Sequence, residues 1–112
     1  MYLPMFLESI RRIQEGIKTT TLRPLKNNYT VGAILTLEGT NIRIQITDRQ
    51  QITVPDGLTP TIAHGEGYGS VQEMVDFLRK RRWGRPIPNK PMIHWLYTFA
   101  LVAAAPPHYE AP

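Results

Sequence analysis

The sequence predicts one small domain of the α+β, mainly β class: a β-barrel of about five to six strands flanked by two helices. Its 112 residues leave room for one modest core. Most of its apolar runs are short and alternate with polar residues, which is typical of strands, and only two segments have helical spacing. Short strands combined with few helices favour a small barrel with the helices at its side.

The N-terminal part predicts a helix followed by a short strand. Proline suits a first helical turn and glycine is a natural stop, so we expect the helix from about Pro4 to Glu15, before Gly16. Its apolar residues recur at helical spacing: Leu3, Phe6, Leu7, Ile10, Ile13 and Ile17. The consecutive threonines 19–21 then favour a strand, because β-branched residues are good strand formers.

The middle of the chain predicts further strands. Residues 33–48, AILTLEGTNIRIQITD, alternate apolar and polar types on both sides of Gly39, which indicates a hairpin. Another short extended piece is expected at Ile52–Val54, before a turn through the Pro-Asp-Gly at 55–57. The segment TIAHGEGYGS, 61–70, carries three glycines, and no regular element is expected there.

The second helix and the last strand have clear signals. Ser70 followed by Glu73 forms a capping box, so a helix should begin there and end at Gly84. Its buried stripe would be Val71, Met74, Val75 and Leu78. Residues 93–101, IHWLYTFAL, predict a long final strand. The domain is expected to span residues 1–105, with a flexible C-terminal tail at 106–112.

Composition narrows the function classes. The chain has no cysteine, which excludes disulfides and thiolate–zinc sites. No apolar run is long enough to span a bilayer, and the N-terminal apolar residues precede the basic ones, the reverse of a signal peptide. We therefore expect a cytoplasmic protein with no membrane partner. The net charge of +4 is uneven, because Arg79 to Arg85 hold five of the thirteen basic residues. That run fits either a solvated helix end or a phosphate-binding patch.

Three residues are candidates for chemistry. Lys18 is either an exposed strand-entry lysine or a half-buried base with a lowered pKa. Thr21 is either a simple strand former or a nucleophile, provided that a base lies within reach. On a regular strand the two would face opposite sides, so they converge only if Lys18 lies in the preceding turn. Glu66, between two glycines, is either an exposed loop residue or a general acid.

Other residues are candidates for ligand contact. Tyr68 and Trp83 lie near predicted loops and could stack on a base, whereas Trp95 is expected in the core. Arg23 could hold a phosphate or a carboxylate, or simply pair with Glu15 or Glu38. His64 has no partner at ligand spacing, so no metal site is expected.

Taken together, four features in order resemble the ASCH family of small domains with a PUA-like barrel, over about residues 6–101. They are the helix ending in GIKTTTLR, the strand entry YTVGAILTL, the glycine-bracketed glutamate GEGYGS before a helix, and the final aromatic strand. The first and third are the specific ones, and the family is associated with RNA and modified nucleosides. The chain departs from the family at Ala33, where an aspartate is usual, and in its basic, proline-rich connection RRWGRPIPNKP.

One branch of that family hydrolyses N(4)-acetylcytidine to cytidine and acetate, using a lysine base, a threonine nucleophile and a glutamate acid. The resemblance places these roles on Lys18, Thr21 and Glu66, with no metal and no cofactor. It makes Thr19, Arg23, Tyr68 and Trp83 the candidate substrate-binding residues. The substrate class would be a modified cytosine nucleoside. Two alternatives stay open: a non-catalytic RNA-binding module and a ribonuclease. The acyl group preferred, the choice between nucleoside and RNA, and the oligomeric state are left open.

Overall fold

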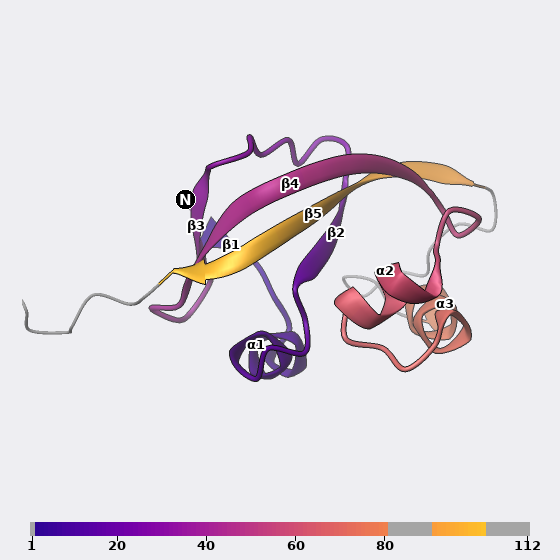
Figure 1. Ribbon diagram of the computed structural model, residues 1–112, viewed down its shortest axis with the longest axis horizontal. Coiled ribbons are helices and arrows are strands. Elements are labelled where there is room, and N and C mark those ends of the chain that lie inside the picture. Colours follow the sequence, from indigo (N-terminus) through magenta and orange to yellow (C-terminus); the bar gives the residue numbers. More distant parts are fainter. Residues whose placement is uncertain (1, 81–90, 103–112) are drawn as a thin grey trace, which may run out of the picture.

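The computed structural model describes residues 2–80 and 91–102, and Figure 1 shows how the elements are arranged. The strands are β1 (Tyr2–Leu3), β2 (Thr20–Pro24), β3 (Ile34–Leu37), β4 (Arg43–Val54) and β5 (Met92–Val102). The helices are α1 (Leu7–Gln14), α2 (Pro60–Gly65) and α3 (Val71–Lys80). The predicted mixture of short strands and few helices is thus confirmed, as is the α+β class.

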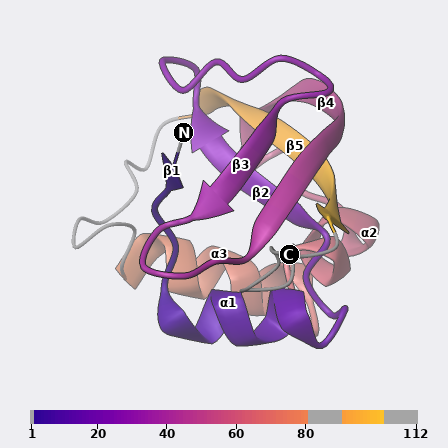
Figure 2. The same cartoon turned by 90° about the vertical axis from the view of Figure 1, so that its left-hand side faces the viewer.

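The five strands form one sheet with the order β1-β3-β4-β5-β2. All neighbours are antiparallel except β1 and β3. The sheet is strongly curved, which Figure 2 shows in a view along the long axis of the molecule. It is not closed, because the edge strands β1 and β2 do not pair with each other. The predicted barrel is therefore wrong in this respect: with β1 only two residues long, a seam is left open between the two edges.

The long ribbon of β4 and β5 is the backbone of the sheet. Its strands pair from Arg43 with Val102 to Val54 with Met92, with one irregularity between Ile46 and Asp48. The hairpin of β3 and β4 turns at Gly39, as predicted, with φ at 81°. The extended piece expected at 52–54 is not separate but the end of β4. The predicted final strand is confirmed as β5, longer by one residue at each end.

In the described part of the chain, three helices flank the sheet rather than the predicted two. In Figure 1, α1 lies below the ribbon and α2 and α3 lie together at one side. The helix that was not predicted is α2, which begins where the Thr59 side chain accepts a hydrogen bond from the Ile62 amide and Pro60 occupies the first turn. These two residues are an ordinary helix-start signal, and the glycines at 65–69 obscured it. Ser70 caps α3 as predicted, accepting from the Glu73 amide at 3.0 Å.

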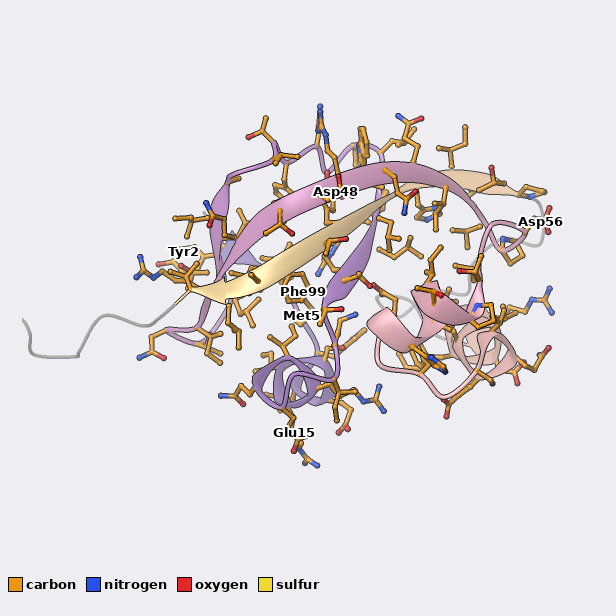
Figure 3. The ribbon with its side chains drawn as sticks, in the orientation of Figure 1. Tyr2, Met5, Glu15, Asp48, Asp56 and Phe99 are labelled. Carbon is orange, nitrogen blue, oxygen red and sulfur yellow. The ribbon has the colours of Figure 1, made fainter. Side chains whose placement is uncertain are left out.

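Two apolar clusters hold the elements together. One joins α1 to the sheet and is composed of Leu3, Ile10, Ile13, Leu35, Leu37, Ile44, Ile46, Tyr97 and Phe99. Figure 3 shows Phe99, and Met5 that packs against this cluster, between the ribbon of β4 and β5 and helix α1. The other joins α2 and α3 to the sheet and is composed of Leu22, Val54, Leu58, Ala63, Met74, Leu78 and Leu96. The expected helix end at Gly84 and the expected tail lie outside the described residues. Within residues 2–80 and 91–102, no helix is both long enough and apolar enough to cross a membrane.

Candidate active site

A pocket opens at the seam between the two edges of the sheet. It is a solvent-open pocket of about 430 Å³, a volume that includes open solvent at its mouth. Its lining comes from the segment after β1, from α1, β2 and α3, and from the connection between α2 and α3: Met5, Phe6, Ser9, Lys18, Thr21, Leu22, Arg23, Glu66, Tyr68, Phe77 and Leu78. Five of the predicted site residues are among them, although they lie as far apart in the sequence as Lys18 and Tyr68.

Lys18 and Glu66 form a buried ion pair in this pocket. The Lys18 Nζ lies 3.1 Å from Glu66 Oε1, and each side chain is only 6% exposed. The same Nζ lies 3.4 Å from the Glu66 carbonyl oxygen. Because burying two charges costs free energy that their attraction offsets only in part, such a pair is a poor way to stabilise a fold. Its presence in a pocket points to chemistry.

Lys18 reaches the pocket because it precedes the strand. The α1 helix ends at Gln14, and Gly16 takes a φ of 76°, a conformation that glycine adopts readily. The amides of Ile17 and Lys18 then both donate to the Arg12 carbonyl, at 2.9 and 3.1 Å. Strand β2 begins only at Thr20, so the alternation of strand side chains does not apply to Lys18. Lys18 and Thr21 can therefore line the same pocket.

The glycines beside Glu66 are required by close approach. Glu66 caps the C-terminus of α2, and Gly67 follows with a φ of 97°. A Cβ atom at Gly67 would lie 3.0 Å from the Cδ of Arg12, and one at Gly65 would lie 3.2 Å from a methyl group of Thr20. The two glycines thus let the carboxylate lie between α1 and β2.

Two threonines of β2 take different partners. The Thr20 hydroxyl donates to Glu66 Oε2 in a short hydrogen bond and fixes that carboxylate. The Thr21 hydroxyl oxygen accepts from Arg23 Nε at 3.1 Å. Both threonines are buried. The role of Thr20 was missed, because nothing in a run of three threonines tells which one faces the acid.

An aromatic wall faces these polar groups. Its members are Phe6, Phe77 and Tyr68. The ring centroids of Phe6 and Phe77 are 6.3 Å apart, and those of Phe77 and Tyr68 are 5.7 Å apart. The guanidinium of Arg12 lies 5.6 Å from the centroid of the Tyr68 ring. Tyr68 was predicted to contact ligand, whereas Phe6 was assigned only to the helical pattern of the first helix and Phe77 was not singled out. Both phenylalanines are 37% exposed, so the wall presents solvent-accessible apolar surface at the pocket.

Burial sets the electrostatics of the site. It lowers the pKa of Lys18 from the ordinary lysine value of 10.5, an effect that outweighs the attraction of Glu66 and is assisted by the charges of Arg23 and Arg12. The pKa of Tyr68 is raised to about 12, mainly because the phenol is buried and to a smaller extent because the Glu66 carboxylate is near. At neutral pH the phenol is therefore protonated and can donate a hydrogen bond. Because its pKa is lowered, Lys18 loses its proton at a smaller free-energy cost than a lysine in water does.

Other predicted site residues do not join this pocket. Thr19 is exposed. Its amide donates to the Gly65 carbonyl oxygen at 2.7 Å, and its carbonyl oxygen accepts from the Phe99 amide at 3.0 Å. Trp83 lies outside the described residues, as does the basic run beyond Lys80. Trp95 packs partly buried against the core, with the Arg49 guanidinium 4.4 Å from its ring centroid. In the described part of the chain, no three histidine or acidic residues gather in a way that could hold a metal ion.

The fold resembles that of one solved structure in particular. A comparison with solved structures found the crystal structure of an ASCH domain from Lactobacillus crispatus JV V101, with a TM-score of 0.62. The two chains are 13% identical, and the match covers 89% of this chain and 79% of that one. No family model and no curated protein matches this chain. The chain thus has the fold of an ASCH domain, and a fold alone does not determine the chemistry of its site.

Proposed function

We propose that this protein is an ASCH-family amidohydrolase that cleaves the N4-acyl amide of modified cytosine nucleosides such as N(4)-acetylcytidine. The observation that supports this function best is the buried ion pair of Lys18 and Glu66 in the pocket that Thr21 also lines. A nucleophile, a base and an acid are the groups that transfer of an acyl group requires. The aromatic wall opposite them offers a surface on which a pyrimidine ring can stack.

The pair of Lys18 and Glu66 shares one proton, and the position of that proton decides which residue can act as base and which as acid. Transfer of that proton from Lys18 Nζ to Glu66 Oε1 gives a neutral amine and a carboxylic acid, and burial lowers the free-energy cost of this neutral form. The neutral Lys18 then takes the hydroxyl proton of Thr21 as its oxygen attacks the acyl carbonyl carbon. Glu66 gives its proton to the leaving N4 nitrogen, which releases cytidine and leaves the acyl group as an ester on Thr21.

Hydrolysis of that ester restores the neutral form of the pair, with the proton on Glu66, and return of that proton to Lys18 restores the ion pair. A water molecule attacks the acyl carbon and loses a proton to the Glu66 carboxylate, while Lys18 returns its proton to the Thr21 oxygen. The acid is released and the pair again carries a single proton on Glu66. In the first half-reaction Glu66 loses a proton and Lys18 gains one, and in the second the reverse happens. The side chains of Lys18, Thr21 and Glu66 therefore account for every proton transfer of the cycle.

The first test is release of cytidine from N(4)-acetylcytidine by the purified protein, with Lys18→Ala as the matched variant. We expect the wild-type protein to release cytidine and the variant to lose at least about 100-fold in kcat/KM, the usual contribution of a general base. Equal release by both proteins would contradict the role of Lys18. No release by a folded wild-type protein would contradict the amidohydrolase itself.

The alternative functions are an RNA-binding module and a ribonuclease, favoured by the basic run that starts at the exposed Arg79. Salt separates them from the first proposal. Binding through phosphates weakens steeply as salt rises, because counterions are released. Hydrolysis of an uncharged nucleoside should change little between low and high salt. A protein that shows no hydrolysis but binds RNA in a salt-dependent way would belong to the second class.

A further inference from the structure

Arg23 is a buried cation that contacts three residues in two parts of the fold, its own strand β2 and the segment that follows β1. Its side chain is 4% exposed and lines the pocket. Its Nε donates to the Thr21 hydroxyl oxygen at 3.1 Å, and its Nη2 donates to the Pro4 carbonyl oxygen at 2.7 Å and approaches the Met5 sulfur at 3.7 Å. Pro4 directly follows the edge strand β1, whereas Arg23 belongs to the opposite edge strand β2. The guanidinium therefore bridges the open seam that backbone hydrogen bonds leave unclosed.

We propose that Arg23 is a positioning residue that fixes the direction of the Thr21 hydroxyl and couples it to the closure of the seam. This inference rests on the proposed function, because it assigns Thr21 as the nucleophile. A guanidinium has five donors and no acceptor, so the Thr21 oxygen can only accept from it. The hydroxyl proton of Thr21 must then point away from Arg23. It is left free for a base on another side of the pocket.

The charge of Arg23 also acts on both reacting groups. A cation 3.1 Å from the Thr21 oxygen stabilises the negative charge that develops there during attack. The same cation disfavours a proton on Lys18. The titratable and charged groups that act on Lys18 are Glu66 after α2, Arg23 on β2 and Arg12 on α1, with the protonated Tyr68 also lining the pocket. Arg23 is the member of this set that touches the nucleophile.

The geometry demands arginine rather than lysine. The planar fork places one nitrogen on the Thr21 oxygen and another on the Pro4 carbonyl at the same time, and a single ammonium group cannot hold both. Arg23→Lys therefore keeps the charge and loses the fork, and Arg23→Gln loses the charge as well. Arg49 offers a matched control, because its Nη1 also holds two partners, Asn28 and the Tyr29 carbonyl oxygen, outside the pocket.

The experiment compares wild type, Arg23→Lys, Arg23→Gln and Arg49→Lys, each measured per folded molecule. We expect Arg23→Lys to lower kcat for N(4)-acetylcytidine about 100-fold, the size of losing one preorganised donor, with KM changed less than about threefold. Arg49→Lys should leave both constants unchanged. A rise in KM with unchanged kcat would overturn the proposal and make Arg23 a substrate-binding residue only.

An NMR measurement tests the same inference without relying on activity. Three-bond couplings should report a single χ1 rotamer of Thr21 in the wild-type protein and averaged rotamers in Arg23→Lys. The pKa of Lys18, followed at its side chain, should rise in Arg23→Gln and stay near its wild-type value in Arg23→Lys. An unchanged Thr21 rotamer in Arg23→Lys would overturn the positioning role. If the wild-type protein releases no cytidine, the proposed function fails, and these couplings still decide whether Arg23 orients Thr21.

Discussion

The β4–β5 ribbon and the seam between β1 and β2 are built in opposite ways. The ribbon is held by a nearly continuous backbone ladder, and it buries apolar side chains such as Ile46 and Phe99. Among the described residues, the strands β1 and β2 at the seam do not pair through their backbones, and the guanidinium of Arg23 bridges from β2 to the Pro4 carbonyl oxygen after β1. Beside the seam lies a buried ion pair, while the ribbon's contributions to the two cores are mostly apolar.

This difference teaches where stability and chemistry reside. Apolar burial stabilises a fold at about 25 cal/mol per Å² and needs no particular geometry of charges. Buried charges cost free energy and act only in one arrangement. We therefore expect changes in the ribbon to alter stability without altering chemistry. Changes in the seam should alter chemistry whether or not they alter stability.

The largest expected effect comes from removing one charge of the ion pair. Lys18→Met leaves the Glu66 carboxylate buried without its cation and should lower the free energy of unfolding by about 3–5 kcal/mol. The double variant Lys18→Met with Glu66→Gln removes both charges and keeps an oxygen for the Thr20 hydroxyl, so much of that stability should return. Neither variant should hydrolyse the amide. Denaturant unfolding and the cytidine assay check both statements.

A ribbon variant provides the control for this prediction. Ile46→Ala should also cost about 2–5 kcal/mol, since Ile46 is 1% exposed in the core. Its kcat per folded molecule should stay within about twofold of wild type. If Ile46→Ala lowers kcat as strongly as Lys18→Met does, or if the double variant is no more stable than the single one, the separation between ribbon and seam is wrong.

The pH dependence of the reaction follows from the lowered pKa of Lys18. The active form of the pair carries one proton, and above the pKa of Lys18 that proton is lost, so kcat/KM should fall about tenfold per pH unit there. Because burial lowers this pKa below 10.5, the fall should begin below that pH. Rates of the uncatalysed reaction at each pH are subtracted. A plateau that continues to pH 10.5 would mean that Glu66 does not supply the proton.

Much of the ribbon could be predicted from the sequence because its signals are local. Alternating residues around Gly39 and the aromatic run at 93–101 predict strands whatever the rest of the chain does. The closed barrel was wrong because closure depends on a two-residue edge strand, β1, which has no pattern of its own. Helix α2 was missed because the glycines that follow it hid the start signal of Thr59 and Pro60.

The site is non-local, so a single sequence predicts it less well. Local patterns made Lys18, Thr21 and Glu66 candidates and favoured an exposed loop position for Glu66, and only the family resemblance assigned them the roles of base, nucleophile and acid. The structure lines one pocket with all three, and their chemical roles are still a prediction. The partner of Thr20 and the bridge made by Arg23 depend on tertiary contacts, which no spacing in the sequence reports.

The smallest expected effect compares a glycine of the seam with a glycine of the sheet's hairpin turn. Gly67 and Gly39 both have positive φ, at 97° and 81°, so alanine at either position should cost about 1–2 kcal/mol of backbone strain. The Gly39 site has no atom within 4 Å of an added Cβ, whereas that atom at Gly67 lies 3.0 Å from Arg12 and 3.7 Å from the Cβ of Lys18. Gly67→Ala should therefore displace the Arg12 side chain, whose charge acts on Lys18, and lower kcat several-fold, while Gly39→Ala leaves kcat unchanged. Equal kcat values for the two variants, measured beside their unfolding curves, would show that Arg12 yields without disturbing the base, and that the seam tolerates small shifts as the ribbon does.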